Sequence, residues 1–163
     1  MSCEYRLSIE SRTHTGLHIL KGAVYRVLGA KWTSGVHVSD SHGRLTVRFD
    51  RKPSDVEVAH IESETNKKIQ ENVSVEVLEM DRAEAEARWG DFIYDVFPLP
   101  STITRPTILY IPDQNAPEGQ DFWNVNACNK THTRTTGEVG PIQISKWRYR
   151  PSKQLLEISF DIE

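Results

Sequence analysis

With 163 residues, of which 37% are hydrophobic, the chain can bury a core without disulfide bonds. Its 20 basic and 23 acidic residues give a formal net charge of −3, which argues against a protein that coats nucleic acid through an overall positive charge. No apolar run could span a membrane, and Glu4 and Arg6 stand where the apolar core of a signal peptide would begin. We therefore expect a cytoplasmic protein with no membrane segment, folded as one domain over residues 1–163.

Hydrophobic spacing predicts the first elements of the chain. Residues 4–10 alternate between apolar and polar side chains, which indicates a short strand. Apolar residues then recur at helical spacing over residues 14–28, with Thr13 as the predicted N-cap and Gly29 as the stop. The apolar face of this helix is suited to packing against a core.

Turn and capping signals predict the next elements. Two strand-like segments, residues 31–38 and 45–49, flank turn-forming residues and predict an antiparallel hairpin. Ser54 is the predicted N-cap of a second long helix that extends to Asn72, and Glu57 completes its capping box.

The second half of the chain has mostly strand patterns. Strands are expected at residues 73–78 and 108–111, a helix at 81–89, and a hairpin that joins strands at 142–150 and 156–162. The sum is an α+β fold in which a largely antiparallel sheet packs against two long helices.

Two histidines are spaced to share one face of the first predicted helix. Positions i and i+4 lie on the same face, so the imidazoles of His14 and His18 can aim at one point. Cys128 and His132 repeat this spacing in a distant part of the chain. Each pair alone is more often a surface or packing feature, but imidazoles and a thiolate together are typical zinc ligands. The pattern therefore predicts a Zn²⁺ site if the fold brings the two pairs together.

The spacing also excludes one class of zinc hydrolase. Zincins carry the motif HExxH with glutamate as the general base, but Thr15 stands at that position here. A hydrolase built on this site would need another base, or it would rely on the metal to activate water.

Both pairs belong to longer segments that match one protein family: residues 12–18, 20–24, 31–33, 49–55, 123–133 and 136–142. These segments resemble the free-standing alanyl-tRNA editing proteins of the small AlaX type, and the similarity extends over nearly the whole chain. The HxxxH and CxxxH motifs are also similar to those of the editing domains of alanyl- and threonyl-tRNA synthetases. Residues 114–120 look like a longer loop than typical small members have, and we expect this loop to affect access to the pocket.

The resemblance implies a trans-editing hydrolase, an aminoacyl-tRNA deacylase that removes serine, and in some members glycine, from mischarged tRNA(Ala). An alanine pocket cannot strongly exclude either amino acid, so a second site has to remove them. By this resemblance, zinc is held by four residues, His14, His18, Cys128 and His132. The first two are implied to be catalytic. Thr33 is implied to lie in the amino-acid pocket, where its hydroxyl could bond to that of serine.

A local excess of positive charge suggests where the acceptor end of tRNA would bind. Lys130 and Arg134 stand next to the second motif, and Lys146, Arg148 and Arg150 alternate along one predicted strand, so they share a face. Such a row could contact phosphates, although cations also protect the edge strand of a sheet from pairing.

Several readings remain open from the sequence. Zinc could activate water, polarise the ester or only position the substrate, and a metal-free enzyme could use the histidines as acid or base. A different class of protein, a non-catalytic tRNA-binding module with a structural zinc, is also open, because four protein ligands make a closed site. The sequence does not indicate which amino acid is removed or what the oligomeric state is.

Overall fold

The computed structural model describes residues 8–163. The helices and strands follow in this order: α1 (Ile9–Leu28), β1 (Thr33–Ser39), β2 (His42–Arg48), α2 (Asp55–Glu71), β3 (Glu76–Glu79), α3 (Arg82–Trp89), the 3-10 helix η1 (Gly90–Ile93), β4 (Thr107–Pro112), β5 (Phe122–Ala127), the 3-10 helix η2 (Thr136–Val139), β6 (Ile142–Arg150) and β7 (Leu155–Ile162). None of the helices described in this range is long and apolar enough to cross a lipid bilayer.

The strands form two antiparallel sheets. One has four strands in the order β1-β2-β7-β6, and the other has three in the order β3-β4-β5. This arrangement confirms the α+β class and the antiparallel pairing. The prediction of one sheet was too simple, because the strands divide into two sheets, whereas the short helix expected at residues 81–89 forms as α3 in addition to the long helices α1 and α2.

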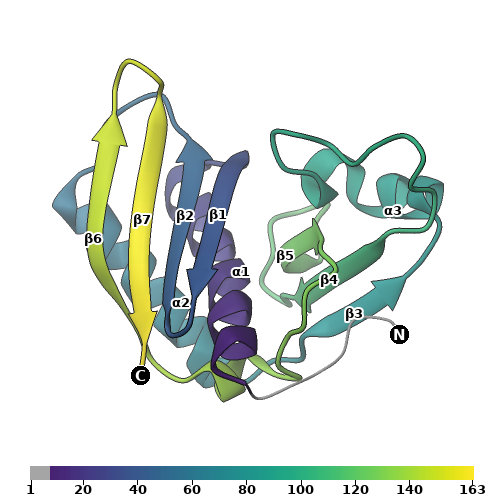
Figure 1. Cartoon of the computed structure of the whole chain (residues 1–163), viewed down its shortest axis with the longest axis horizontal. Coiled ribbons are helices and arrows are strands. Elements are labelled where there is room, and N and C mark those ends of the chain that lie inside the picture. The colour runs from purple at the N-terminus through teal and green to yellow at the C-terminus, as the bar shows by residue number, and fades with distance from the viewer. Residues whose placement is uncertain (1–7) are drawn as a thin grey trace.

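The two sheets lie on different sides of α1. Figure 1 shows α1 and α2 behind one face of the four-stranded sheet, with the three-stranded sheet beyond α1. The main core joins α1 and α2 to the four-stranded sheet and reaches Leu109, Ile111 and Trp123 of the smaller sheet. Helix α1 is therefore the central element against which both sheets pack.

Strand β4 is buried on both of its faces. Leu109 and Ile111 belong to the main core, whereas Ile108 and Tyr110 belong to a second cluster with Trp89 of α3. Alternate side chains of a strand point to opposite faces, so the smaller sheet is covered by α1 on one side and by α3 on the other. This double packing holds β4, and with it the paired strand β5, between α1 and α3.

Helix α1 begins earlier than its sequence pattern predicts. Ser8, not Thr13, is the N-cap, and its hydroxyl accepts a hydrogen bond from the backbone N–H of Ser11 at 3.2 Å. The strand predicted for residues 4–10 is wrong for Ile9 and Glu10, which are helical, and its residues before Ser8 lie outside the described part of the chain. The hydroxyl of Thr13, within the helix, lies 2.6 Å from the carbonyl of Asp40, so a tertiary contact supports the extra turn.

Several other local predictions are confirmed. The capping box of α2 joins Ser54 and Glu57, and α2 ends at Asn72 in the left-handed conformation. The hairpins β1–β2 and β6–β7 form as expected. Strand β5, which had no strand prediction, is the element that carries the chain to Cys128.

Candidate metal site and adjoining cavity

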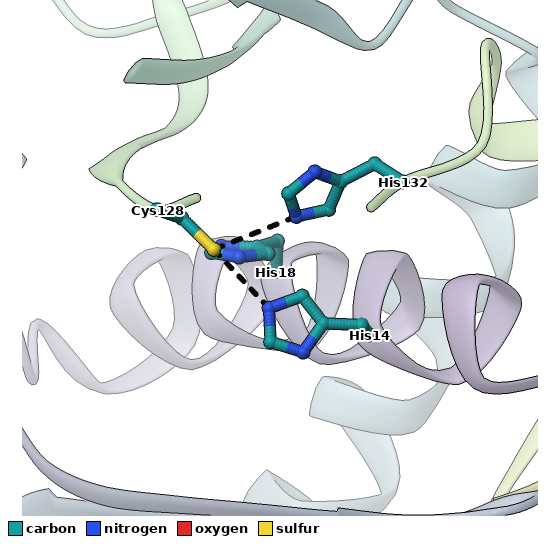
Figure 2. Close-up of side chains that lie close together, drawn as sticks. All are labelled: His14, His18, Cys128 and His132. Atoms are coloured by element: carbon teal, nitrogen blue, oxygen red, sulfur yellow. Dashed lines mark hydrogen bonds between the residues drawn. The ribbon is translucent and has the colours of Figure 1, made fainter. Parts of the chain in front are cut away.

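The two sequence motifs meet between α1 and the end of β5. Figure 2 shows His14 and His18, both from α1, pointing toward the side chains of Cys128 and His132. The Nε2 atom of His14 lies 3.2 Å from Sγ of Cys128, and that sulfur lies 3.6 Å from Nε2 of His132. One ligand atom from each of the four side chains lies within 4.8 Å of all the others. The fold thus gathers three imidazoles and one thiol around a single point.

Hydrogen bonds from α1 position the segment that follows β5. The hydroxyls of Ser11 and Thr131 are 2.7 Å apart, and the backbone N–H of Thr133 donates to the Thr15 hydroxyl at 2.9 Å. Ser11 and Thr15 flank His14 on the helix, and Thr131 and Thr133 flank His132. The contacts between hydroxyl-bearing neighbours therefore align the two motifs directly.

A close approach of α1 and β5 supports this alignment. The indole N–H of Trp123 donates to the carbonyl of Ile19 at 2.9 Å, and its ring lies against Gly22. A Cβ atom at Gly22 would lie 2.3 Å from Nε1 of Trp123 and 2.7 Å from its backbone oxygen. Only glycine allows the two elements to pack this closely, so Gly22 is a structural requirement for the site.

Asn124 orients one of the four ligands. Its Oδ1 lies 3.0 Å from Nδ1 of His18, and an amide oxygen can only accept, so Nδ1 carries the proton. The Nε2 atom of His18 is then the unprotonated nitrogen. It is buried and has no hydrogen-bond partner among the described residues. A metal ligand commonly has its second nitrogen held in this way.

Burial keeps the three imidazoles neutral. It lowers the pKa of His14 to about 4, with further lowering by the positive charges of Lys130 and Lys21. It also lowers the pKa of His132 to about 3, with help from His14. The pKa of His18 is well below its ordinary value, chiefly because the side chain is buried. Neutral imidazole is the form that binds a metal ion.

The four donors fit a metal ion. Tetrahedral coordination with bonds of about 2.0–2.3 Å places ligand atoms about 3.3–3.8 Å apart, close to the two distances to the Cys128 sulfur. The donor types, the neutral imidazoles and the unpartnered Nε2 atom of His18 all agree with such a site. These four residues could therefore hold a metal ion.

A cavity of about 390 Å³ adjoins the candidate metal site. His14, His18 and Cys128 line it, whereas His132 does not. The remaining lining residues comprise apolar, basic and neutral polar side chains and one carboxylate, that of Asp95. The apolar side chains include Leu17, Val36, Leu99 and Ile103, and the basic ones are Lys21, Arg105 and Lys130. The cavity can thus offer an apolar wall and positive charge to a ligand that reaches the four donors.

Thr33 lines a second, smaller cavity. This inner cavity has a volume of about 30 Å³, and the Thr33 side chain is buried beside it. Lys21, Asp95 and Asn126 line both cavities, so the two adjoin. Thr33 lines only the inner cavity, which none of the four donors lines. The inner volume is enough for a group of about the size of one or two waters.

The predicted basic residues lie in two places. Lys130 lines the larger cavity, and Arg134 is exposed a short distance along the chain. Lys146, Arg148 and Arg150 share the outer face of β6, as predicted, but they do not line the cavity, and the latter two pair with Glu157.

The loop of residues 114–120 lies away from the larger cavity. None of its residues lines that cavity, and Gln120 donates to the Tyr25 hydroxyl at 3.1 Å near the other end of α1. The expectation that this loop affects access to the pocket therefore has no support in the structure.

Comparison with known proteins connects this site to one family. The chain is 38% identical over 135 residues to the alanine–tRNA ligase of Methanopyrus kandleri, and 37% identical over 134 residues to that of Pyrococcus furiosus. The ligase of Pyrobaculum arsenaticum is 37% identical over 136 residues. The chain is homologous to one segment of the alanine–tRNA ligases. No protein-family model matches the chain.

The homology to alanine–tRNA ligases covers most of this chain but a small part of each relative. The matches span 82–83% of the chain and 14% of each of these three ligases. They confirm the resemblance to alanyl-tRNA synthetase sequences that the motifs indicated.

The sequence did not indicate the roles of several residues around the candidate metal site and its cavities. Lys21, Gly22 and Asn124 lie in segments that carried the family resemblance, but their contacts depend on how α1 meets β5. Asp95 lies in an irregular segment that gave no signal at all. The spacing of Lys21, three positions after His18 and so on the same helical face, was the one clue in the sequence that could have drawn attention to it.

Proposed function

We propose that the protein is an aminoacyl-tRNA deacylase that hydrolyses the ester of mischarged tRNA(Ala), first of all Ser-tRNA(Ala). The observation that carries this proposal is the convergence of the HxxxH and CxxxH pairs beside a cavity, in a chain homologous to alanine–tRNA ligases. Gly-tRNA(Ala) is a second substrate, because glycine is smaller than alanine and escapes exclusion by size. We further propose that residues 1–163 form one editing domain that acts in the cytoplasm.

The four donors would hold a zinc ion. A bound zinc supplies Lewis acidity toward water or an ester carbonyl. His14 and His18 line the cavity and face the incoming ester, whereas the fully buried His132 supports the site from behind. A pKa of about 4 makes His14 a weak base at neutral pH. The electrostatics thus favour a role as ligands over a metal-free mechanism in which the histidines act as bases.

The inner cavity supports recognition of serine. Thr33 is buried and lines this cavity, so its hydroxyl would bond to the hydroxyl of a serine side chain that enters it. Alanine has no such group, so its ester would gain nothing from the contact. A site that bonds to the extra hydroxyl can remove serine and spare alanine.

The acceptor end of tRNA would approach from the open side of the larger cavity. Lys130 and Arg105 line it and carry the charge that a phosphate requires. Arg134 is exposed nearby in the chain and would add to this contact. The row of Lys146, Arg148 and Arg150 lies outside the cavity and would contact a more distant part of the tRNA.

A deacylation panel tests the function. Purified protein should carry about one zinc per chain and release serine from Ser-tRNA(Ala), and a chelator should stop the release while the protein stays folded. Failure to hydrolyse the serine, glycine and threonine esters at metal saturation would refute the proposal. Continued hydrolysis after complete removal of metal would instead support the metal-free mechanism.

Variants of the two cysteines test the ligand set. Cys128→Ala should lose most of the bound metal and the hydrolysis that depends on it, because a thiolate contributes strongly to zinc binding. Cys3→Ala, which alters the other cysteine of the sequence, should change neither property. Equal losses from both variants would contradict the assignment of Cys128.

One observation favours a second candidate function. Four protein donors within 4.8 Å of one another make a closed set, as in structural zinc sites. The protein would then be a tRNA-binding module without catalysis. That candidate predicts tRNA binding without ester hydrolysis, and unfolding when a chelator removes the metal.

A further inference from the structure

Asp95 has a unique position between the two cavities. It lines both of them, and within residues 8–163 it is the only acidic residue that does so. The other charged residues that line the larger cavity are basic. A negative charge at this junction therefore needs an explanation other than attraction of a phosphate.

Two donors from neighbouring elements hold the carboxylate of Asp95. Nζ of Lys21 donates to its Oδ1 atom at 3.1 Å, and Nδ2 of Asn126 lies 3.3 Å from the same oxygen. Lys21 and Asn126 are also bonded to each other at 2.9 Å, and Asn126 donates to the carbonyl of Ile93 at 3.1 Å. The carboxylate is thus fixed by groups on α1, β5 and η1.

One oxygen of this carboxylate is left for a ligand. Oδ2 accepts no hydrogen bond from residues 8–163, and the side chain is 39% exposed. An ionised carboxylate can accept several hydrogen bonds, so Lys21 and Asn126 do not use its full capacity. A preorganised acceptor that points into a cavity is suited to bind a cationic donor.

We propose that Asp95 binds the α-ammonium group of the aminoacyl ester and so selects esters with a free amino group. This inference rests on the proposed function. Such an ester carries one positive group, and Asp95 supplies the one carboxylate among the described residues that line the cavity. Lys21 is a positioning residue, because its ammonium group holds the carboxylate from the buried side.

The position of Asp95 agrees with this assignment. Three of the four donors, His14, His18 and Cys128, line the larger cavity, and Asp95 lines the same cavity. Lys21, which holds Asp95, follows His18 by three residues on α1, about 4.5 Å along the helix axis. An aminoacyl ester with its carbonyl at the donors would thus carry its ammonium group in the cavity that Asp95 lines.

Three groups would then surround the α-carbon of the substrate. The ester faces the four donors, the ammonium group faces Asp95, and the side chain enters the inner cavity beside Thr33. An N-blocked ester has lost the positive charge that Asp95 would bind, so the site should bind it more weakly. Aminoacyl-tRNA, and not N-acylated or peptidyl-tRNA, is the substrate class that this arrangement fits.

Binding of a stable analogue tests the inference directly. The probes are the seryl amide of 3′-amino-3′-deoxyadenosine and its N-acetyl derivative, each titrated by calorimetry into the metal-loaded full chain. The wild-type protein should bind the N-acetyl probe about 30-fold more weakly, as expected for the loss of one charge-assisted hydrogen bond. Equal binding of the two probes by the wild-type protein, or binding of neither, would overturn the inference without any variant.

A charge-neutral variant and a matched control complete the test. Asp95→Asn should bind the two probes within about threefold of each other, whereas Asp161→Asn, a half-exposed residue on β7 away from both cavities, should discriminate as the wild type does. Circular dichroism checks that both variants fold. Full discrimination by a folded Asp95→Asn protein would overturn the inference.

Hydrolysis separates the inference from the proposed function. Discrimination between the probes without hydrolysis of Ser-tRNA(Ala) would refute the deacylase and leave the role of Asp95 intact. Equal hydrolysis of Ser-tRNA(Ala) and N-acetyl-Ser-tRNA(Ala) would support the deacylase and refute the role of Asp95.

Discussion

At the scale of single residues, the site depends on partners that the ligands themselves do not reveal. The four donors follow from two i,i+4 spacings, which the sequence displays plainly. The amide that orients His18 and the carboxylate at the cavity junction do not follow from any spacing. Both reach the site through contacts between α1 and segments more than 70 positions away.

The hydrogen bond from His18 to Asn124 leads to a prediction about metal affinity. Asn124→Ala removes the acceptor that fixes the tautomer of His18, so we expect zinc affinity to fall about 10- to 100-fold. Competition with a chromogenic chelator measures this change. Asn115→Ala, at an exposed position outside the larger cavity, is the matched control and should bind zinc as the wild type does. An unchanged affinity in Asn124→Ala would show that His18 is oriented by other contacts.

The hydroxyl of Thr33 leads to a prediction about substrate selection. Thr33→Val keeps the shape of the side chain and removes the hydroxyl, so the preference for Ser-tRNA(Ala) over Ala-tRNA(Ala) should fall about 10-fold. Rates of deacylation of the two esters give this ratio. Thr46→Val, on the neighbouring strand and outside both cavities, should leave the ratio unchanged. A folded Thr33→Val protein with full selectivity would remove Thr33 from the recognition step.

At the scale of elements, the close contact between α1 and β5 at Gly22 and Trp123 determines whether the two motifs meet. Gly22→Ala would place a methyl group against the Trp123 ring and backbone, and the elements would have to separate. We expect the free energy of unfolding to fall by about 1–3 kcal/mol, and zinc affinity to fall with it.

Denaturant titration and zinc titration together measure both effects of Gly22→Ala. Gly35→Ala is the matched control, because a Cβ at Gly35 meets no atom within 4 Å and the residue does not have a positive φ. If Gly22→Ala and Gly35→Ala bound zinc with equal affinity, the close contact between α1 and β5 would not be required for metal binding.

Local sequence signals predicted that a helix or strand exists better than they predicted its first and last residues or its tertiary contacts. The capping box of Ser54 and Glu57 is a purely local interaction, and the structure contains it. The start of α1 was wrong because the helix is extended by tertiary contacts, such as that between Thr13 and the carbonyl of Asp40. Strand β5 was not predicted although residues 123–127 alternate between apolar and polar side chains, and the buried Asn126 shows that a polar residue of this strand also lies inside the fold.

At the scale of the whole molecule, the division into two sheets was not visible in the sequence. Pairing of β3, β4 and β5 depends on contacts of α1 and α3 with opposite faces of β4. The alternation of apolar and polar residues predicts a strand but does not indicate which of several other strands it will pair with. The four clustered donors could be predicted because a metal site constrains residue types and spacing, whereas the cavity beside them is a product of the packing of distant segments.

The buried imidazoles predict how the stability of the metal-free protein depends on pH. The pKa values of His14 and His132 are about 4 and about 3 in the folded protein, and both values are close to 6.5 in an unfolded chain. Below pH 6.5 the unfolded chain therefore binds more protons, so stability should fall as the pH is lowered toward 4. Each histidine contributes a slope of about 1.4 kcal/mol per pH unit in this range.

Denaturant titrations of the metal-free protein between pH 4 and pH 7 check this prediction. His14→Gln should reduce the slope, whereas His60→Gln, an exposed residue of α2, should leave it unchanged. A stability that does not depend on pH in this range would contradict the burial of neutral imidazoles.

The placement of the four donors has a consequence for the exchange of a bound ion. His132 has no exposed surface and His18 is only 2% exposed, so solvent reaches the donor set from the side of His14 and Cys128, which line the larger cavity. An aminoacyl end seated in that cavity would block the same route. Dissociation of the metal should consequently become slow for as long as the substrate remains bound, because the bound aminoacyl end would block the exit of the ion.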